Sequence, residues 1–211
     1  MTSRGRGRFI SLEGGEGVGK TTQLRALAEQ LAQRGIEVIT TREPGGSPGA
    51  EAIRDLLLSG EDGRWSAPAE ALLFAAARAD HVEKTIRPAL EAGKWVLSDR
   101  FLDSSLAYQG GAGGLGVETV GRLHEFGSAG FLPDRTLVLL LAESQGMVRA
   151  ELRDEGAADR IGRRRADYHR AVERSFREIA RGDPERVRVV DAAGPVEGVT
   201  SRLMHQLADL L

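Results

Sequence analysis

A glycine-rich turn directly after an apolar strand constrains this chain more than any other feature of its sequence. The strand is expected at Phe9–Glu13, and residues 14–21 then read GGEGVGKT, the phosphate-loop pattern of glycine, four residues, glycine, lysine and threonine. Glycine lets the backbone turn tightly, so that its N–H groups converge on phosphate oxygens, and the helix that follows adds its positive end. The expected nucleoside triphosphate site consists of Gly14, Gly15, Glu16, Gly17, Val18, Gly19, Lys20, Thr21 and Thr22.

Two side chains of this loop have expected roles in phosphate chemistry. Lys20 is expected to reach the β- and γ-phosphates, and the hydroxyl group of Thr21 is expected to hold Mg²⁺. The alternative is a glycine-rich turn with an incidental lysine. The strand before the loop and the helix after it favour phosphate binding, because both lie where that function requires them.

Apolar runs alternate with helical patterns along the whole chain. A helix is expected around residues 24–31, followed by one after Ser47. Further helices are expected at 67–92, 117–129, 163–181 and 195–211, and strands at 9–13, 37–41, 94–98, 136–142 and 186–190. This alternation predicts a three-layer α/β fold, in which helices cover both faces of a five-stranded parallel sheet. A single domain over residues 1–211 is expected.

Composition excludes several classes of protein. Without cysteine the chain has no disulfide framework, thiolate metal site or thiol nucleophile. A net charge of −2 lacks the basic excess typical of nucleic-acid binding. The apolar runs fall far short of the roughly 20 residues that a membrane span needs, and no signal peptide is recognisable. A cytoplasmic protein with neither a nucleic-acid nor a membrane partner is therefore expected.

Two segments of the chain lack the regular patterns of strands and helices. Residues 110–116 are mostly glycine, which predicts a mobile loop, and residues 149–165 are rich in arginine and interrupt a helical pattern. The simplest interpretation of such a charged segment is a solvated helix face.

The histidines at 81, 124, 169 and 205 lack the spacing of a metal site and are expected to be ordinary surface or helix residues.

The third predicted strand ends in Asp99 and Arg100, at the edge of the sheet where ligands bind in folds of this class. An acid that serves Mg²⁺ beside a cation that grips a phosphate suits phosphoryl transfer between two phosphorylated molecules. An ordinary ion pair at a strand end is the alternative. The composition argues against a GTP-dependent switch, since such proteins read guanine with an asparagine-containing motif and this chain has no asparagine.

Residues 99–109, DRFLDSSLAYQ, resemble the signature of the thymidylate kinases. Residues 41–46, 54–58, 70–78, 133–134 and 191–192 resemble other segments of that family, so that the similarity extends from about residue 9 to residue 211. It implies a phosphate-loop nucleoside monophosphate kinase fold with a lid at about 149–165. It also implies an enzyme that uses ATP and Mg²⁺ to convert dTMP into dTDP.

The resemblance assigns roles on the acceptor side. Phe74 would stack on thymine, Arg78 would hydrogen-bond the base, and two arginines would hold the acceptor phosphate through their bidentate guanidinium groups. Spacing alone does not separate Phe74 from an ordinary core residue. The expected acceptor-binding residues are Glu16, Arg54, Phe74, Arg78, Arg100, Ser104, Ser105 and Tyr108.

Some thymidylate kinases carry an arginine in the phosphate loop where this chain has Gly17, and others supply the catalytic cation from the lid. By this resemblance the chain belongs to the second type, with Arg153 or Arg160 facing the transferred phosphoryl group and Arg149 packing on adenine. Leu140 and Gly162 depart from the family pattern, which usually has acidic residues there. The expected catalytic residues are Lys20, Arg100, Arg153 and Arg160, and the expected metal ligands are Thr21 and Asp99.

Two alternative functions remain open at this point: a kinase for another nucleotide or nucleoside, and a phosphate-loop ATPase that acts as a switch rather than as a kinase. The two differ in whether ADP release depends on the acceptor. The resemblance also implies a homodimer that packs through long helices, to which the apolar residues 67–79 would contribute a face.

Overall fold

The computed structural model describes residues 6–61, 63–141, 160–162 and 164–211. Its sheet has the strand order β2-β3-β1-β4-β5, and every pairing is parallel. The strands are β1 (Phe9–Glu13), β2 (Val38–Arg42), β3 (Trp95–Asp99), β4 (Arg135–Leu140) and β5 (Val187–Asp191). The predicted five-stranded parallel sheet is confirmed.

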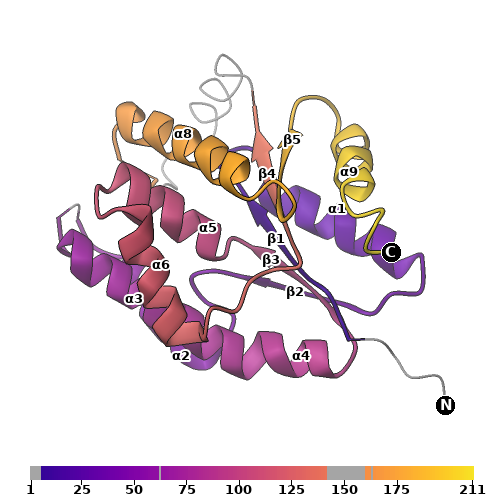
Figure 1. Ribbon diagram of the computed structural model, residues 1–211, viewed down its shortest axis with the longest axis horizontal. Coiled ribbons are helices and arrows are strands. Elements are labelled where there is room, and N and C mark those ends of the chain that lie inside the picture. Colours follow the sequence, from indigo (N-terminus) through magenta and orange to yellow (C-terminus); the bar gives the residue numbers. More distant parts are fainter. Residues whose placement is uncertain (1–5, 62, 142–159, 163) are drawn as a thin grey trace.

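Helices cover both faces of this sheet (Figure 1). On one face α1 and α9 pack against β1, β3 and β4, and on the other face the apolar clusters join the sheet to η1, α4, α5, α6 and α8. The helices are α1 (Lys20–Ala32), α2 (Pro48–Leu58), α3 (Ala67–His81), η1 (Val82–Ile86), α4 (Arg87–Glu91), α5 (Leu102–Ser105), η2 (Leu106–Ala112), α6 (Val117–Ser128), α8 (Ala166–Gly182) and α9 (Val196–His205).

Burial on both faces explains why the central strands were recognisable as apolar runs. Every residue of β1 and β4 is buried, whereas the edge strand β2 is only partly covered. Two polar side chains of the central strands pair with each other: the hydroxyl groups of Ser11 and Thr136 lie 3.0 Å apart. The start of α2 follows capping chemistry, since Ser47 accepts a hydrogen bond from the N–H of Ala50 and Pro48 occupies the first turn.

The predicted loop at 110–116 is wrong in its first part. The π-helix η2 extends to Ala112, and Gly110 is buried. A Cβ atom on Gly111 would lie 2.0 Å from the hydroxyl oxygen of Ser175, so this glycine lets η2 approach α8 closely. Glycine serves packing here, and a turn follows only at Gly113–Gly116, where Gly114 and Gly116 have positive φ angles.

The predicted helix at 67–92 is not uniform. Its residues form α3, the π-helical η1 and α4, with Pro88 placed in the first turn of α4. Proline lacks the N–H group that an α-helix would use at this position, and the wider η1 turn lies immediately before it.

All four histidines lie in helices, in agreement with the prediction of surface or helix residues, and His81 and His124 are buried. Nε2 of His124 lies 2.7 Å from the carbonyl oxygen of Phe131, and burial lowers the pKa of His124 to about 4. The ring is therefore neutral at pH 7 and donates this hydrogen bond. Among the described residues, no helix is long and apolar enough to cross a membrane.

Candidate active site

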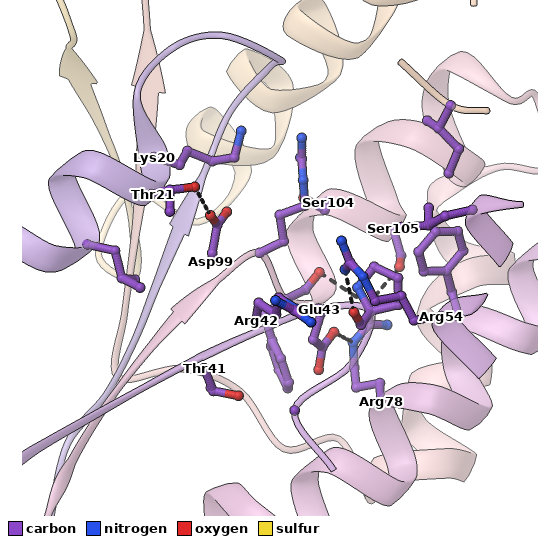
Figure 2. A pocket seen from close by; sticks show the side chains of 18 of the residues that line it. Lys20, Thr21, Thr41, Arg42, Glu43, Arg54, Arg78, Asp99, Ser104 and Ser105 are labelled. Carbon is purple, nitrogen blue, oxygen red and sulfur yellow. Dashed lines mark hydrogen bonds and ion pairs between the residues drawn. The ribbon is translucent and has the colours of Figure 1, made fainter. Parts of the chain in front are cut away.

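A cavity of about 800 Å³ opens at the carboxyl ends of β1, β2 and β3. Ligands bind at this edge in open parallel sheets, because the loops that follow neighbouring strands converge there. Figure 2 shows Thr21 and Asp99 on one side of the cavity and Arg54, Arg78 and Ser105 on the other. The predicted site residues that line it are Glu16, Gly17, Gly19, Lys20, Thr21, Thr22, Arg54, Phe74, Arg78, Asp99, Arg100, Ser104, Ser105 and Tyr108.

The phosphate loop joins β1 to α1 through glycines in conformations that other residues rarely adopt. Gly14 and Gly19 have φ angles of 131° and 95°. A Cβ atom on Gly14 would lie 2.3 Å from the carbonyl oxygen of Leu139, so that only glycine fits beside β4 at this position. Gly14 therefore lets the loop turn directly at the end of the sheet.

Lys20 is buried beneath this loop. Its Nζ donates hydrogen bonds to the carbonyl oxygens of Gly15, at 2.6 Å, and Gly14, at 3.2 Å. Burial, together with the nearby positive charge of Arg100, lowers the pKa of Lys20 to about 8. A bound phosphate would supply the negative charge that this buried ammonium group lacks.

Thr21 and Asp99 form the predicted metal pair. The hydroxyl group of Thr21, at the start of α1, donates a 2.8 Å hydrogen bond to Oδ2 of Asp99, at the end of β3. Hydroxyl and carboxylate oxygens suit Mg²⁺, which is commonly held by one or two protein groups together with substrate phosphates and water. The donor set present fits that ion. Among the described residues, no cluster of three or more histidine, aspartate or glutamate side chains offers a separate metal cage.

Arg100 connects the phosphate loop with the helical segment after β3. Its Nη1 donates to the carbonyl oxygen of Gly14 and to the hydroxyl group of Ser104, both at 3.0 Å. Its Nη2 donates to Glu16 at 2.6 Å and to the hydroxyl group of Tyr108 at 3.2 Å. Arg100 lowers the pKa of Glu16, and burial raises the pKa of Tyr108, which therefore remains a neutral phenol.

Arg78 belongs to α3, and its buried side chain contacts the turn after β3. Its Nε donates to Oε2 of Glu43 at 2.8 Å, and its Nη2 donates to the hydroxyl group of Ser105 at 2.7 Å. Phe74 lies one turn earlier on α3, is half-buried and also lines the cavity. Nη1 of Arg54 donates to the carbonyl oxygen of Pro44 at 2.6 Å, which holds Arg54 at the cavity wall.

Sequence reasoning did not select three polar side chains that lie in or beside the cavity. Glu43 holds Arg78 and also lies 2.9 Å from Nδ1 of His81, Gln109 lines the cavity, and Glu70 accepts a hydrogen bond from Nε2 of Gln109 at 3.0 Å. A lone carboxylate within the apolar run at 67–77 was a usable signal for Glu70. No sequence signal identified Arg78 as the partner of Glu43.

The predicted lid residues are only partly described. Arg149 and Arg153 lie outside the described residues. Arg160 is buried, where its Nε donates to the carbonyl oxygen of Leu57 at 2.9 Å and its Nη2 to Glu70 at 2.5 Å. It is not among the residues that line the cavity. The structure therefore does not bring Arg160 to the phosphate loop.

The structure shows what surrounds Leu140 and Gly162, the two positions that depart from the family pattern. Leu140 is buried at the end of β4, in the cluster that joins the sheet to α8. The carbonyl oxygen of Gly162 lies 3.2 Å from Nε2 of His169. Leucine and glycine have no carboxylate, so neither position supplies the acidic side chain that is usual in the family pattern.

Comparison with known proteins gives one consistent result. A family model described as thymidylate kinase matches residues 12–203. The chain is 59% identical to a thymidylate kinase of Rhizorhabdus wittichii over 205 residues, which is 97% of this chain and 99% of the relative. It is 47% identical over 212 residues to a thymidylate kinase of Afipia carboxidovorans, covering 98% and 93% of the two chains. The crystal structure of thymidylate kinase from Ehrlichia chaffeensis superposes with a TM-score of 0.77 at 30% identity, covering 96% and 99% of the two chains.

Proposed function

This chain belongs to the thymidylate kinase family, and we propose that it transfers the γ-phosphoryl group of ATP to dTMP, giving dTDP and ADP. The observation that carries this function is the position of Arg100, which contacts both the phosphate loop at Gly14 and the aromatic side of the cavity at Tyr108. A donor phosphate at the loop and an acceptor phosphate at Arg100 would meet within the same cavity.

On the donor side, the residues of the phosphate loop and Lys20 would bind the ATP phosphates. Thr21 and Asp99 would hold Mg²⁺, which when bound neutralises charge on the donor phosphates. Their 2.8 Å separation supports this assignment, because one ion can contact both oxygens once the hydrogen bond between them is given up.

On the acceptor side, Phe74 would stack on thymine while Arg78 and Ser105 would contact its polar edge. Arg78 is already fixed by Glu43 and by Ser105, so that little side-chain freedom is lost on binding. Arg54 and Arg100 would hold the acceptor phosphate, and Glu16 would lie beside the sugar. These assignments are supported by the shared cavity wall.

No protein general base is needed for this reaction. The second pKa of a phosphate monoester is about 6, so that the acceptor oxygen is already largely ionised at neutral pH. Catalysis then depends on in-line positioning and on neutralising charge that develops between the two phosphates. Two cations at this place support that mechanism: Lys20, which is buried, and Arg100, whose side chain is largely covered.

A coupled assay for ADP across the nucleoside monophosphates tests the function. We expect ADP release only when an acceptor is added, with dTMP the preferred acceptor. ATP hydrolysis that is indifferent to the monophosphate would instead identify a switch ATPase, and preference for another acceptor would identify a different kinase.

The division between the two sides gives a binding prediction. Arg100→Met is expected to weaken dTMP binding by about tenfold or more, because it removes hydrogen bonds to a charged phosphate, each worth about 1.5 kcal/mol or more. ATP binding is expected to change less than threefold. Calorimetric titration of each nucleotide measures both effects, with Arg177→Met, on the exposed face of α8, as the matched control. Equal loss of both affinities would contradict the assignment of Arg100.

The proposed oligomer is a homodimer that packs through α3 and α6, which lie side by side (Figure 1). These helices expose large apolar side chains, with Phe126 of α6 95% exposed and Leu72 of α3 56% exposed. Exposed apolar groups of this size are typical of an interface. The proposed site of action is the cytoplasm, because both substrates are multiply charged and do not cross a bilayer unaided.

Phe126→Glu is expected to convert this dimer into a monomer, because burying an unpaired carboxylate in an apolar interface costs several kcal/mol. Sedimentation velocity over a range of protein concentrations measures the change. Val189→Glu, on the exposed edge of β5, is the control and should leave the sedimentation coefficient unchanged. A wild-type protein that sediments as a monomer at every concentration would refute the dimer.

A further inference from the structure

Glu13, the last residue of β1, is a completely buried carboxylate that does not line the cavity. Both of its oxygens accept hydrogen bonds from the segment after β3. Oε1 accepts from the backbone N–H of Phe101 at 2.7 Å, and Oε2 accepts from the hydroxyl group of Ser104 at 2.5 Å. Glu13 therefore binds two points of one turn and has no direct access to a nucleotide.

Arg100 lies within this turn and has an unusual backbone conformation. Its φ angle is 72°, in the left-handed region that a non-glycine residue adopts only when its surroundings enforce it. Its N–H donates to the carbonyl oxygen of Leu12 at 2.9 Å, its carbonyl oxygen accepts from the hydroxyl group of Ser98 at 2.7 Å, and Glu13 holds the next N–H along the chain. Two of these three restraints come from the end of β1.

The same carboxylate also orients the side chain of Arg100, through Ser104. A hydroxyl group has one proton, and Ser104 donates it to Glu13. Its lone pairs are then available to Nη1 of Arg100, which donates to this oxygen at 3.0 Å. In its ionised form Glu13 is an acceptor-only group, and this form fixes the direction of the relay, because a group that donated to Ser104 would turn the hydroxyl proton towards the guanidinium.

The charges around Glu13 come from several elements. Asp103 on α5 lies close to it but is itself paired with Arg186, whose Nη1 and Nη2 lie 2.7 and 3.0 Å from the Asp103 oxygens. Burial and the charge of Asp103 raise the pKa of Glu13 to about 7, while Ser104, Arg100 and the N–H of Phe101 oppose that rise. Lys20 also faces this group. A carboxylate buried at this cost, with both oxygens directed at one turn, points to a role in holding that turn.

We propose that Glu13 is a positioning residue for the acceptor phosphate, whose two carboxylate oxygens hold the turn after β3 in the conformation that directs Arg100 into the cavity. The inference rests on the proposed role of Arg100 in binding dTMP. Glu13 acts only through Arg100 and Ser104 and contacts neither nucleotide.

Glu13→Gln is the first test, because glutamine has nearly the same shape but only one acceptor oxygen and so cannot satisfy both donors. We expect the KM and Kd for dTMP to rise about tenfold, the effect of one hydrogen bond to a charged group, and the Kd for ATP to stay within twofold. Asp103→Asn is the matched control, since it alters a neighbouring buried carboxylate that is bonded to Thr136 and Arg186 instead of to this turn. It should leave the ratio of the two nucleotide affinities unchanged.

A double-mutant cycle distinguishes positioning from general destabilisation. Added to Arg100→Met, Glu13→Gln should weaken dTMP binding no further, because its effect is transmitted by the side chain that is already missing. Ser104→Ala interrupts the relay but keeps the bond between Glu13 and Phe101. It should weaken dTMP binding severalfold in the wild type and cause no further loss of dTMP affinity in Arg100→Met. It carries the test if Glu13→Gln fails to fold, as judged by circular dichroism.

Three results would overturn the proposal: a dTMP affinity within twofold of wild type in Glu13→Gln, an equal loss of ATP affinity, or additive effects with Arg100→Met. If Glu13→Gln does not fold, the same three results in Ser104→Ala overturn it. Failure of the proposed function is distinguishable, since wild-type protein would then show no dTMP-dependent release of ADP and no dTMP binding.

Discussion

Lys20→Ala is expected to reduce kcat by about 10³-fold or more, which corresponds to about 4 kcal/mol of transition-state stabilisation. The Lys20 ammonium group is buried directly beneath the phosphate loop, where its charge is poorly screened by water. Charge that develops on the transferred phosphoryl group would lose a fixed cation in this variant. Alanine has no group that could neutralise that charge.

The fold is expected to survive this substitution. Nζ of Lys20 bonds only to the carbonyl oxygens of Gly14 and Gly15 among the described residues, and burial lowers the pKa of Lys20 to about 8, because desolvation disfavours its charged form. Single-turnover kinetics and circular dichroism measure the two expectations separately. Lys84→Ala, on the exposed surface of η1, is the control. A folded Lys20→Ala enzyme that retained more than a tenth of the wild-type kcat would show that the assigned role is wrong.

The sheet could be predicted because its central strands are buried on both faces. Residues of β1 and β4 alternate between two apolar clusters, so that each strand appears in the sequence as a nearly continuous apolar run. The phosphate loop could be predicted for a different reason. Its chemistry lies within one contiguous segment, in which Gly14 is required by the approach of the Leu139 carbonyl group.

Packing between distant segments could not be predicted in the same way. Glycine content at 110–116 indicates backbone freedom, but the hydroxyl group of Ser175 on α8 decides that Gly111 is needed for close contact. The sequence contains no local trace of that neighbour, because the two residues meet only when η2 packs against α8. Composition therefore predicted a loop where the structure has a helical turn.

Buried ion pairs had the same limitation within the candidate site. The segment that contains Glu43 was recognised as part of the family pattern, yet its partner Arg78 lies 35 residues later on α3. A local sequence pattern does not say which cation neutralises which acid. Partner choice is decided by tertiary geometry, here by the contact of the segment after β2 with α3 at the cavity wall.

The same limitation applies to Arg160, which the resemblance to lid-type thymidylate kinases suggested as a catalytic cation. In the structure Arg160 and Arg164 both donate to Oε2 of Glu70, at 2.5 and 2.8 Å. Leaving the buried carboxylate of Glu70 without a cation would strongly destabilise the protein. The two arginine partners of Glu70 therefore fix the end of the arginine-rich segment against α3. In this position Arg160 binds Glu70 and does not reach the phosphate loop, so that Arg153 is the other lid arginine expected to meet the phosphoryl group.

At least one of Arg153→Ala and Arg160→Ala is expected to lose about 10²-fold in kcat, about 2.7 kcal/mol of barrier, with little change in either nucleotide's Kd. Such a pattern belongs to an interaction made mainly in the transition state, as expected of an arginine that meets the transferred phosphoryl group. Single-turnover measurements at saturating ATP and dTMP provide kcat, and calorimetry provides the two dissociation constants. If kcat stayed within threefold of wild type in both variants, these arginines would have a solvated or structural role and not a catalytic one.

Glu70→Gln separates the two roles of Arg160. If Arg160 only anchors the segment, Arg160→Ala and Glu70→Gln should lower the Tm together, and the loss of kcat should appear in Arg153→Ala alone. If Arg160 leaves Glu70 to meet the phosphoryl group during turnover, Arg160→Ala should lose kcat while Glu70→Gln, which keeps the arginine and weakens its hold, should not. The ion pair between Arg160 and Glu70 would then be a ligand-free arrangement that the transition state exchanges for the phosphate, because a developing negative charge competes for the same guanidinium.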